Sequence, residues 1–306
     1  MKSVTIINKA GEKLVMELRH PEKSGFAILQ ITGLNPVNAS ITMTNMSGVP
    51  GAHFSNAVVG GRNITMQLSY FQCENFMDID TQRRKIYQFF PVGKKIEIVF
   101  EMMDGRMFET TGYIESNGVE IFTQIQSYQI SILCEKATFR DGFTEGITHI
   151  FYGVEPEFTF PFMNNSLTDN LINFGTHKTE GVDNIYYEGD GTPGVEITIY
   201  CTGPVGNIDI YNITYGQKMS IDVGILANIS GGPLTNGDII FVSTIPMEKK
   251  GILLRGGRST NILGAMGRFP DWLQIHKGDN KIAITADNGL ENSKMSIRYF
   301  NEYNGI

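Results

Sequence analysis

Residues 95–116, KIEIVFEMMDGRMFETTGYIES, contain the alternation of apolar and polar residues that decides the fold class. Ile96, Ile98 and Phe100 share one face of an extended strand, and glutamates occupy the opposite face. Asp104-Gly105 is a pair typical of the two-residue type I′ turn, because both central residues of that turn take positive φ. The stretch therefore predicts a β-hairpin with one buried face.

The neighbouring segments extend this pattern and interrupt it once. Residues 126–135, QSYQISILCE, alternate in the same way and predict a third strand, so the three strands form a meander. Residues 78–94, DIDTQRRKIYQFFPVGK, instead predict one short helix. Asp80 or Thr81 is its expected N-cap, and Pro91 ends it.

The second half of the sequence predicts a separate β domain. Scattered aromatic residues and two prolines without a clean period follow residue 135, and we place a domain boundary near residue 145. Beyond it, short apolar segments are separated by Gly, Asn and Asp, as in a β-sandwich of jelly-roll type. The predicted strands are 170–175, 184–189, 195–201, 208–214, 218–223, 237–245, 251–256, 280–286 and 294–300.

The predicted fold is therefore mainly β, with two domains. Residues 1–145 form an N-terminal β-sandwich or barrel-like domain with the one short helix. Residues 146–306 form the C-terminal jelly-roll β-sandwich.

Composition excludes several classes of protein. Acidic residues outnumber basic ones by 32 to 25, and the formal net charge is −7, so a basic surface for nucleic acid is not expected. Cys73, Cys134 and Cys201 are an odd number of widely spaced thiols, unlike a disulfide scaffold. No apolar stretch approaches the roughly 18–20 residues of a membrane helix. We expect a protein made in a reducing cytoplasm and not inserted in a membrane.

No motif of enzyme chemistry stands out. The five histidines lack metal-ligand spacing, and neither a G-x-S-x-G nor a Walker motif occurs. Gly189, Gly191 and Gly194 form a literal G-x-G-x-x-G, but Pro193 lies inside it and a predicted strand follows at once, so it is interpreted as turns. We expect no catalytic, cofactor-binding or metal-binding residues, and no enzyme.

Trp272 supports an alternative function. It is the only tryptophan, and an exposed aromatic ring on a jelly-roll domain can stack on a sugar, although packing is the commoner role. A carbohydrate-binding or carbohydrate-active protein is therefore one alternative, with Trp272 as a weak candidate sugar contact.

Several segments, in a fixed order, resemble one known family. In the N-terminal half they are VTIINKAGEKLVMEL (4–18), GVPGAHFSNAVVGGRNITMQL (48–68), DTQRRKIYQFFP (80–91), GRMFETTGYIES (105–116) and YQISILCEKATF (128–139). In the C-terminal half they are NFGTHKTEGVDNIYYEGDGTPGVEITI (173–199), NILGAMGRFPDWLQIHKGDNKIAIT (261–285) and MSIRYFNEYNGI (295–306). The sequence thus resembles the distal tail proteins of long-tailed, non-contractile (siphovirus-type) bacteriophages. In that family a basic residue, here Arg62, precedes a strand with alternating apolar positions.

The resemblance implies a structural virion protein at the distal end of the phage tail, synthesised in the bacterial host cytoplasm. It implies a homohexameric ring that joins the tail tube protein to the tail-tip hub or tail-associated lysin, next to the tape measure protein. It also implies an attachment platform for receptor-binding or baseplate proteins, and a galectin-like C-terminal sandwich. DNA would pass through the ring without specific binding, as an acidic chain permits.

We expect the hairpin of residues 96–115 to pair its edge with a neighbouring subunit, because ring contacts can be built by pairing exposed strands. An ordinary internal hairpin is an equal alternative, and a tail tube or capsid subunit is a further alternative function. The candidate ring-interface residues are Ile98, Phe100, Met102, Met107 and Phe108.

Overall fold

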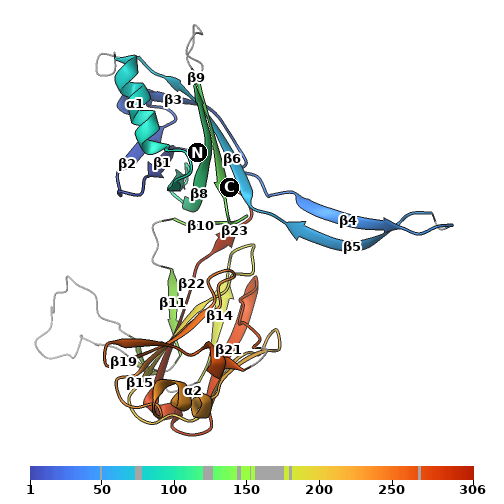
Figure 1. The fold of residues 1–306 in the computed structure, drawn as a ribbon, viewed down its shortest axis with the longest axis vertical. Coiled ribbons are helices and arrows are strands. Elements are labelled where there is room, and N and C mark those ends of the chain that lie inside the picture. Colours follow the sequence, from blue (N-terminus) through green and yellow to red (C-terminus); the bar gives the residue numbers. More distant parts are fainter. Residues whose placement is uncertain are drawn as a thin grey trace, which may run out of the picture. The chain divides into compact units, whose positions relative to one another are not determined.

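The chain divides into two compact units. The computed structural model describes residues 1–48, 50–72, 78–119, 127–142, 146–151, 153–155, 176–178, 181–267 and 270–306. Unit 1 consists of residues 1–144 and 302–306, and unit 2 of residues 145–301 (Figure 1). Strands dominate both units, so the mainly β prediction is confirmed. Assigning residues 302–306 to the C-terminal domain was wrong, because they pair with a strand of unit 1.

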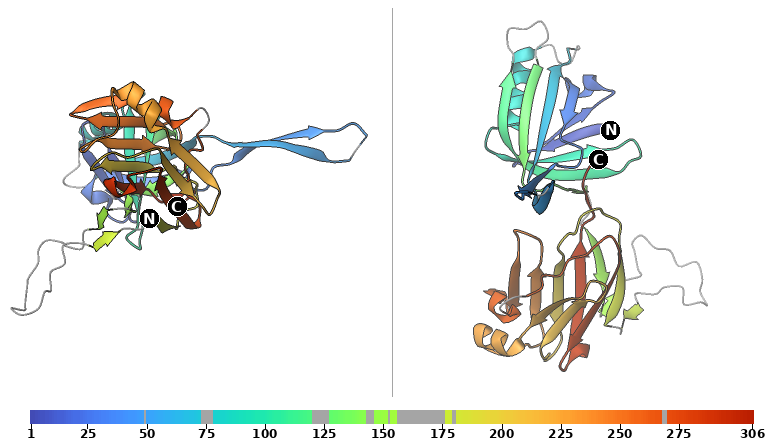
Figure 2. Two further views of the ribbon diagram at one scale, coloured as in Figure 1. Left: turned by 90° about the horizontal axis from the view of Figure 1, so that it is seen from below. Right: turned by 90° about the vertical axis from the view of Figure 1, so that its right-hand side faces the viewer.

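Unit 1 is built on one large, strongly curved antiparallel sheet (Figure 2). Across the sheet, the strand order is β2 (Lys13–Glu17), β1 (Ser3–Ile7), β7 (Lys95–Glu101), β8 (Met107–Val119), β9 (Ser127–Cys134), β6 (Arg62–Tyr70) and β3 (Phe26–Thr32). Off this path, β10 (Phe139–Asp141) pairs with β8 and with β23 (Glu302–Tyr303). The two edge strands approach each other beside the 3-10 helix η1 (Pro21–Lys23), so the sheet is barrel-like.

The short helix of unit 1 begins earlier than predicted. Helix α1 spans Ile79–Phe89, and its N-cap is Asp78, not Asp80 or Thr81. The Asp78 carboxylate accepts hydrogen bonds from the Asp80 backbone N–H (3.1 Å) and from the Thr81 hydroxyl, which satisfies the first turn. The helix buries Gln82, Ile86 and Phe89.

The hairpin of β7 and β8 is present, but its turn differs from the prediction. Gly105 has positive φ (86°) and Asp104 does not, so a type I′ turn is excluded. The Met102 N–H donates to the Arg106 carbonyl oxygen (2.8 Å) across a three-residue loop. The Asp104 carboxylate accepts from the Arg106 N–H (3.1 Å), which stabilises this loop.

Unit 2 is a β-sandwich, as predicted. One sheet has the order β11 (Ile147–Ile150), β22 (Ser293–Tyr299), β15 (Glu196–Cys201), β18 (Ile239–Ser243), β19 (Lys250–Arg255) and β20 (Arg258–Asn261). The other has the order β14 (Val182–Tyr187), β21 (Gly278–Ala286), β16 (Ile208–Asn212) and β17 (Gln217–Ile221). Buried side chains of both sheets, Ile197 and Ile284 among them, form one core. A separate pair is β12 (Gly153–Glu155) with β13 (Thr176–Lys178).

Several elements of unit 2 were not predicted. Helix α2 spans Val223–Ser230, with the Asp222 carboxylate accepting from the Ile225 N–H (2.9 Å) and Gly231 in the left-handed region (φ 81°). These N-cap and C-terminal signals are local, and they outweigh the strand pattern that precedes them. Strands β11 and β20 and the 3-10 helices η2 (Leu263–Met266) and η3 (Leu290–Asn292) were also missed. The predicted strand 170–175 lies outside the described residues.

Strands β4 (Ala39–Asn45) and β5 (Ala52–Val59) follow β3 and precede β6 in the chain. They form a separate two-stranded sheet. Figures 1 and 2 show this hairpin extending away from the rest of unit 1. We call residues 39–59 the arm.

Candidate assembly surface

The sequence of the arm differs from that of the rest of the chain. Residues 35–61, NPVNASITMTNMSGVPGAHFSNAVVGG, contain no Asp, Glu, Lys or Arg, although 19% of the whole chain is charged. Thr and Val favour strands, and Gly48 (φ 80°) and Gly51 (φ 105°) lie in the connection between them with positive φ. The segment therefore forms a hairpin without charged residues on either face.

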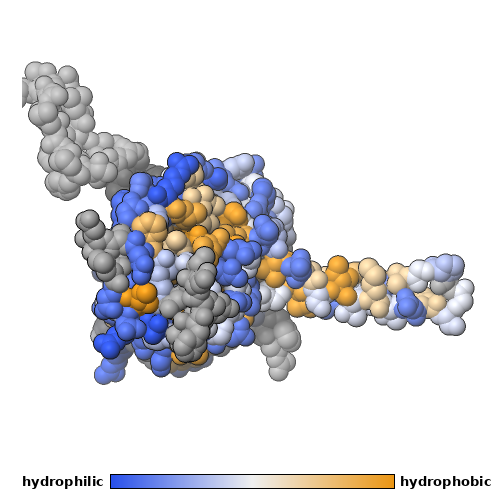
Figure 3. Space-filling view, turned by 90° about the horizontal axis from the view of Figure 1, so that it is seen from above, coloured by the Kyte–Doolittle hydropathy of each residue, from blue (hydrophilic) through white to orange (hydrophobic). Residues whose placement is uncertain are grey.

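All strand residues of the arm are exposed. Ile41, Met43, Phe54, Val58 and Val59 keep 55–59% of their surface accessible, and Figure 3 shows apolar residues spaced along the arm. An isolated two-stranded hairpin is at best marginally stable in water. An exposed apolar strand pair therefore indicates a surface that a partner covers.

A β-bulge places most apolar residues of the arm on one face. The register passes from Thr42↔Asn56 to Met43↔Phe54, which leaves Ser55 without an opposite residue. Directly opposed residues share a face, so one face carries Ala39, Ile41, Met43, Asn45, Ala52, Phe54, Ala57 and Val59. The other face carries Ser40, Thr42, Thr44, His53, Asn56 and Val58. The arm is thus amphipathic without charge.

The arm joins unit 1 at a root formed by residues 33–38 and 60–62. Arg62, which the family resemblance singled out, is buried there, with 1% of its surface accessible. Its guanidinium lies 4.1 Å from the centre of the Phe139 ring. Its hydrogen-bond acceptors are the backbone oxygens of Gly33, Asn35, Ala137 and Asn304. Burial lowers the pKa of Arg62.

The predicted interface hairpin lies largely inside unit 1. Ile98 and Phe100 are fully buried and Phe108 is 4% exposed, whereas Met102 is half-buried and Met107 is exposed. Strand β7 pairs with both β1 and β8, and β8 pairs with β7, β9 and β10. These strand edges are therefore already used within the chain, contrary to the expected edge pairing with a neighbour.

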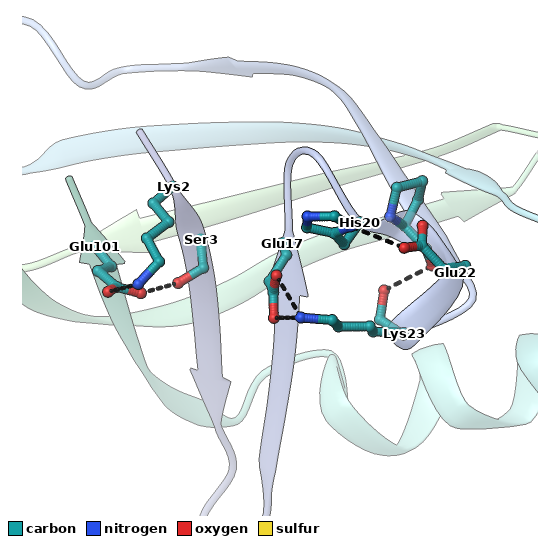
Figure 4. Close-up of polar contacts among 9 residues, drawn as sticks. Lys2, Ser3, Glu17, His20, Glu22, Lys23 and Glu101 are labelled. Atoms are coloured by element: carbon teal, nitrogen blue, oxygen red, sulfur yellow. Dashed lines mark hydrogen bonds and ion pairs between the residues drawn. The ribbon is translucent and has the colours of Figure 1, made fainter. Parts of the chain in front are cut away.

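Charged pairs lie at one end of the neighbouring strands β2, β1 and β7 (Figure 4). The Glu101 carboxylate accepts from the Lys2 ammonium (2.5 Å) and the Ser3 hydroxyl (2.7 Å), and these bonds lower the pKa of Glu101. The Lys23 ammonium donates to Glu17 at 2.7 Å. Glu17 thus places a charge on β2, the last strand in the sheet order, whereas β4 and β5 of the arm carry none.

No grouping suited to catalysis is evident in the described part of the chain. A groove of about 470 Å³ in unit 1 is lined by residues that include Lys9, Lys94, Lys95 and Tyr113. Glu97 is the only carboxylate among its described lining residues, which include no histidine or cysteine. Among the described residues, no cluster of three or more His, Cys, Asp or Glu side chains suits a metal ion. The described helices include none long and apolar enough to cross a bilayer.

Trp272 is half-buried and packs against the core of unit 2. The Lys249 ammonium lies 5.0 Å from the centre of its ring, in cation–π geometry. These contacts account for Trp272 by packing, and its contact with a sugar stays a prediction.

Comparison with known proteins identifies the fold. No protein-family model and no curated protein sequence matches this chain. The crystal structure of the Dit protein of phage SPP1, described as a paradigm of the hub adsorption apparatus in phages infecting Gram-positive bacteria, matches with a TM-score of 0.64. The two chains are 10% identical, and the match covers 98% of this chain and 99% of that one. The phage p2 baseplate in its activated conformation matches with a TM-score of 0.45 at 11% identity, over 98% of both chains. Across both units, this chain therefore has the fold of a phage distal tail protein.

Proposed function

We propose that this chain is a structural protein of a bacteriophage tail tip, and that copies of it form a homohexameric ring. The ring joins the tail tube protein to the tail-tip hub and carries receptor-binding or baseplate proteins. The near-complete fold match to a hub adsorption protein supports the tail-tip role. The role is one of shape and contact, without a chemical step.

The arm is the observation that supports self-assembly. Its apolar face needs a cover, and no other part of the described chain pairs with β4 or β5. A ring is made of heterologous contacts, in which each copy offers one surface and receives another. A projecting arm that lies on the next copy meets this requirement. The absence of charge lets the arm be buried without desolvating ions.

The two units have separate proposed roles. Unit 1, which carries the arm, forms the ring and continues the tail tube. Unit 2 is the galectin-like module that offers a surface to further tail-tip proteins. DNA and the tape measure protein pass through the ring, and the net charge of −7 on each copy disfavours retention of DNA phosphates.

The two faces of the arm provide a matched test. The variant Ile41→Asp/Phe54→Asp places two carboxylates on the apolar face, and Thr42→Asp/Asn56→Asp places two on the opposite face. Native mass spectrometry should find six times 34.0 kDa for the parent chain and the second variant, and monomer for the first. Hexamers of equal stability in both variants would contradict the proposal.

Electron microscopy tests the location and the alternatives. A label on this chain should lie at the distal end of the tail, and purified assemblies should be single closed rings. Stacked tubes or shells would instead favour a tail tube or capsid subunit.

A further inference from the structure

We propose that Arg62 and the segment of residues 302–306, which we call the return segment, together set the direction of the arm. The chain leaves unit 1 after residue 144, forms unit 2, and returns to unit 1 at residue 302. The ordering of the root follows from contacts within unit 1. Only its consequence for assembly rests on the proposed ring.

Arg62 binds three backbone segments at the root of the arm: the stretch around Gly33 and Asn35, Ala137 and Asn304. Its Nη1 donates to the carbonyl oxygens of Gly33 and Asn35, the latter at 2.8 Å, on the side where the chain enters the arm. Its Nη2 donates to Asn304 of the return segment at 2.6 Å. Both Nη2 and Nε donate to Ala137, at 2.6 and 3.0 Å. These five hydrogen bonds use all five guanidinium N–H groups.

The partners of Arg62 indicate a positioning role. All its described hydrogen-bond acceptors are uncharged carbonyl oxygens, although a buried cation is most easily stabilised by a carboxylate. The Phe139 ring adds a cation–π contact. A planar guanidinium can bind several carbonyl groups at fixed angles, which an ammonium group cannot. The side chain thus holds the entry and exit of the arm together.

The return segment is anchored to the sheet at its first residues. Tyr303 pairs with Phe139 in the β10–β23 ladder, and its ring packs edge-on against Phe108 at 5.3 Å between centroids. The Glu302 carboxylate accepts from the Thr138 hydroxyl at 3.0 Å. These contacts fix the segment before it reaches the root.

The final residues of the return segment lie on the root itself. The Ile306 N–H donates to the Leu34 carbonyl oxygen at 3.1 Å. Gly305 lies so close to Pro36 that an added Cβ would come within 2.9 Å of the Pro36 Cδ. Because residues 302–306 follow unit 2 in the chain, the root is completed only after unit 2 has been synthesised. The arm is thus held in place only in a chain that already carries unit 2.

The test measures arm direction without requiring a ring. Spin labels on Ser47→Cys in the arm and Arg84→Cys on α1, in a Cys73→Ser background, report one distance by pulsed electron paramagnetic resonance. The chain is kept dilute enough to be monomeric. Both labelled positions are exposed, and Cys134 and Cys201 are buried. The width of the distance distribution in the parent chain is the reference for the variants.

Deletion of residues 302–306 should at least double the width of that distribution, and Arg62→Met should have the same effect. Asn304→Ala keeps the backbone carbonyl that Arg62 uses and should leave the width unchanged. Circular dichroism checks that each variant is folded. If Arg62→Met does not fold, the deletion variant alone provides the test. An unchanged width in the folded deletion variant would overturn the proposal. A broader distance distribution in a variant that still forms hexamers would support the positioning role. It would count against the arm as the ring contact.

Discussion

The β7–β8 hairpin and the arm have similar local patterns and opposite environments. Both are antiparallel hairpins with one apolar face, yet Phe100 is fully buried and Phe54 is 55% exposed. Alternation indicates that a strand has an apolar face. It does not show whether that face packs in the chain's own core or against a partner. What separates the two hairpins in sequence is charge. The polar face of β7 carries Glu97 and Glu101, and the arm has no charged residue.

The largest expected effect is on the buried hairpin. Phe100→Asp should unfold unit 1. The Phe100 side chain is fully buried and packs edge-on against Phe139, with 5.8 Å between ring centroids, so the aspartate would bury an unpaired carboxylate. The expected loss in the free energy of unfolding is about 4 kcal/mol or more. Urea denaturation of the monomer measures it. Phe54→Asp in the arm is the control and should stay within about 0.5 kcal/mol of the parent.

The second-largest effect is expected from removing the arm. Replacing residues 39–59 with two glycines should leave unit 1 folded, since all the strand residues removed are exposed. The same variant should form no hexamers. Size-exclusion chromatography and circular dichroism provide both readouts. Loss of the unit 1 fold would show that the arm is part of the core, against the exposure of its side chains.

Thiol reactivity should distinguish the exposed arm from the buried cores of the two units. In a Cys73→Ser background, a monomer with Ser55→Cys should react with iodoacetamide at the rate of an exposed thiol. Cys134 and Cys201 should react more slowly by a factor on the order of 10² or more, because burial raises the pKa of both thiols and blocks access. Mass spectrometry of digested protein follows each site. Equal rates at Cys134 and in the arm would contradict the burial of β9.

Alkaline pH should have a smaller effect on the stability of the fold, through Cys201. Burial raises the pKa of Cys201 from 9.0 to about 11, so between these values the unfolded chain loses this proton and the folded chain keeps it. The contribution of Cys201 to stability is therefore fully present below pH 9 and falls as the pH rises towards 11. Urea midpoints from pH 8 to 11 should fall less steeply for Cys201→Ala than for the parent chain. A steeper fall in the variant would reverse the expected sign.

The smallest effect concerns the exposed ion pair between Lys2 and Glu101 at the end of β1 and β7. Glu101→Gln removes the partner of Lys2, which is exposed, and solvent screens such pairs. The thermal midpoint should move by less than about 2 °C, a small shift for a domain of this size. Leu14→Asp, on the neighbouring edge strand but with a buried side chain, is the contrasting variant and should unfold the monomer.

Much of the fold could be predicted because strand alternation and helix caps are local. The β7–β8–β9 meander, helix α1 and the sandwich of unit 2 all follow from short windows of sequence. Some errors were local, such as the Asp78 cap and the Asp104-Gly105 turn, where backbone N–H groups donate to the aspartate carboxylates. Others, such as the placement of residues 302–306, depended on contacts distant in sequence.

The candidate surface was harder to predict. The sequence pattern directed attention to Phe100, whereas Ile41 and Phe54 were not among the candidate interface residues. The uncharged run of residues 35–61 is the signal that identifies the arm in retrospect. Arg62 was noticed as a basic residue before a strand, but its partners lie as far away as Asn304.

By itself, the sequence determined the class of the fold and the position of most strands, because both depend on the period of neighbouring side chains. Only the tertiary structure decided which hairpin is interior, which one projects, and that residues 302–306 return to unit 1. Those outcomes depend on pairing between segments distant in sequence, where many partners satisfy the same local pattern and only the complete set of contacts selects one.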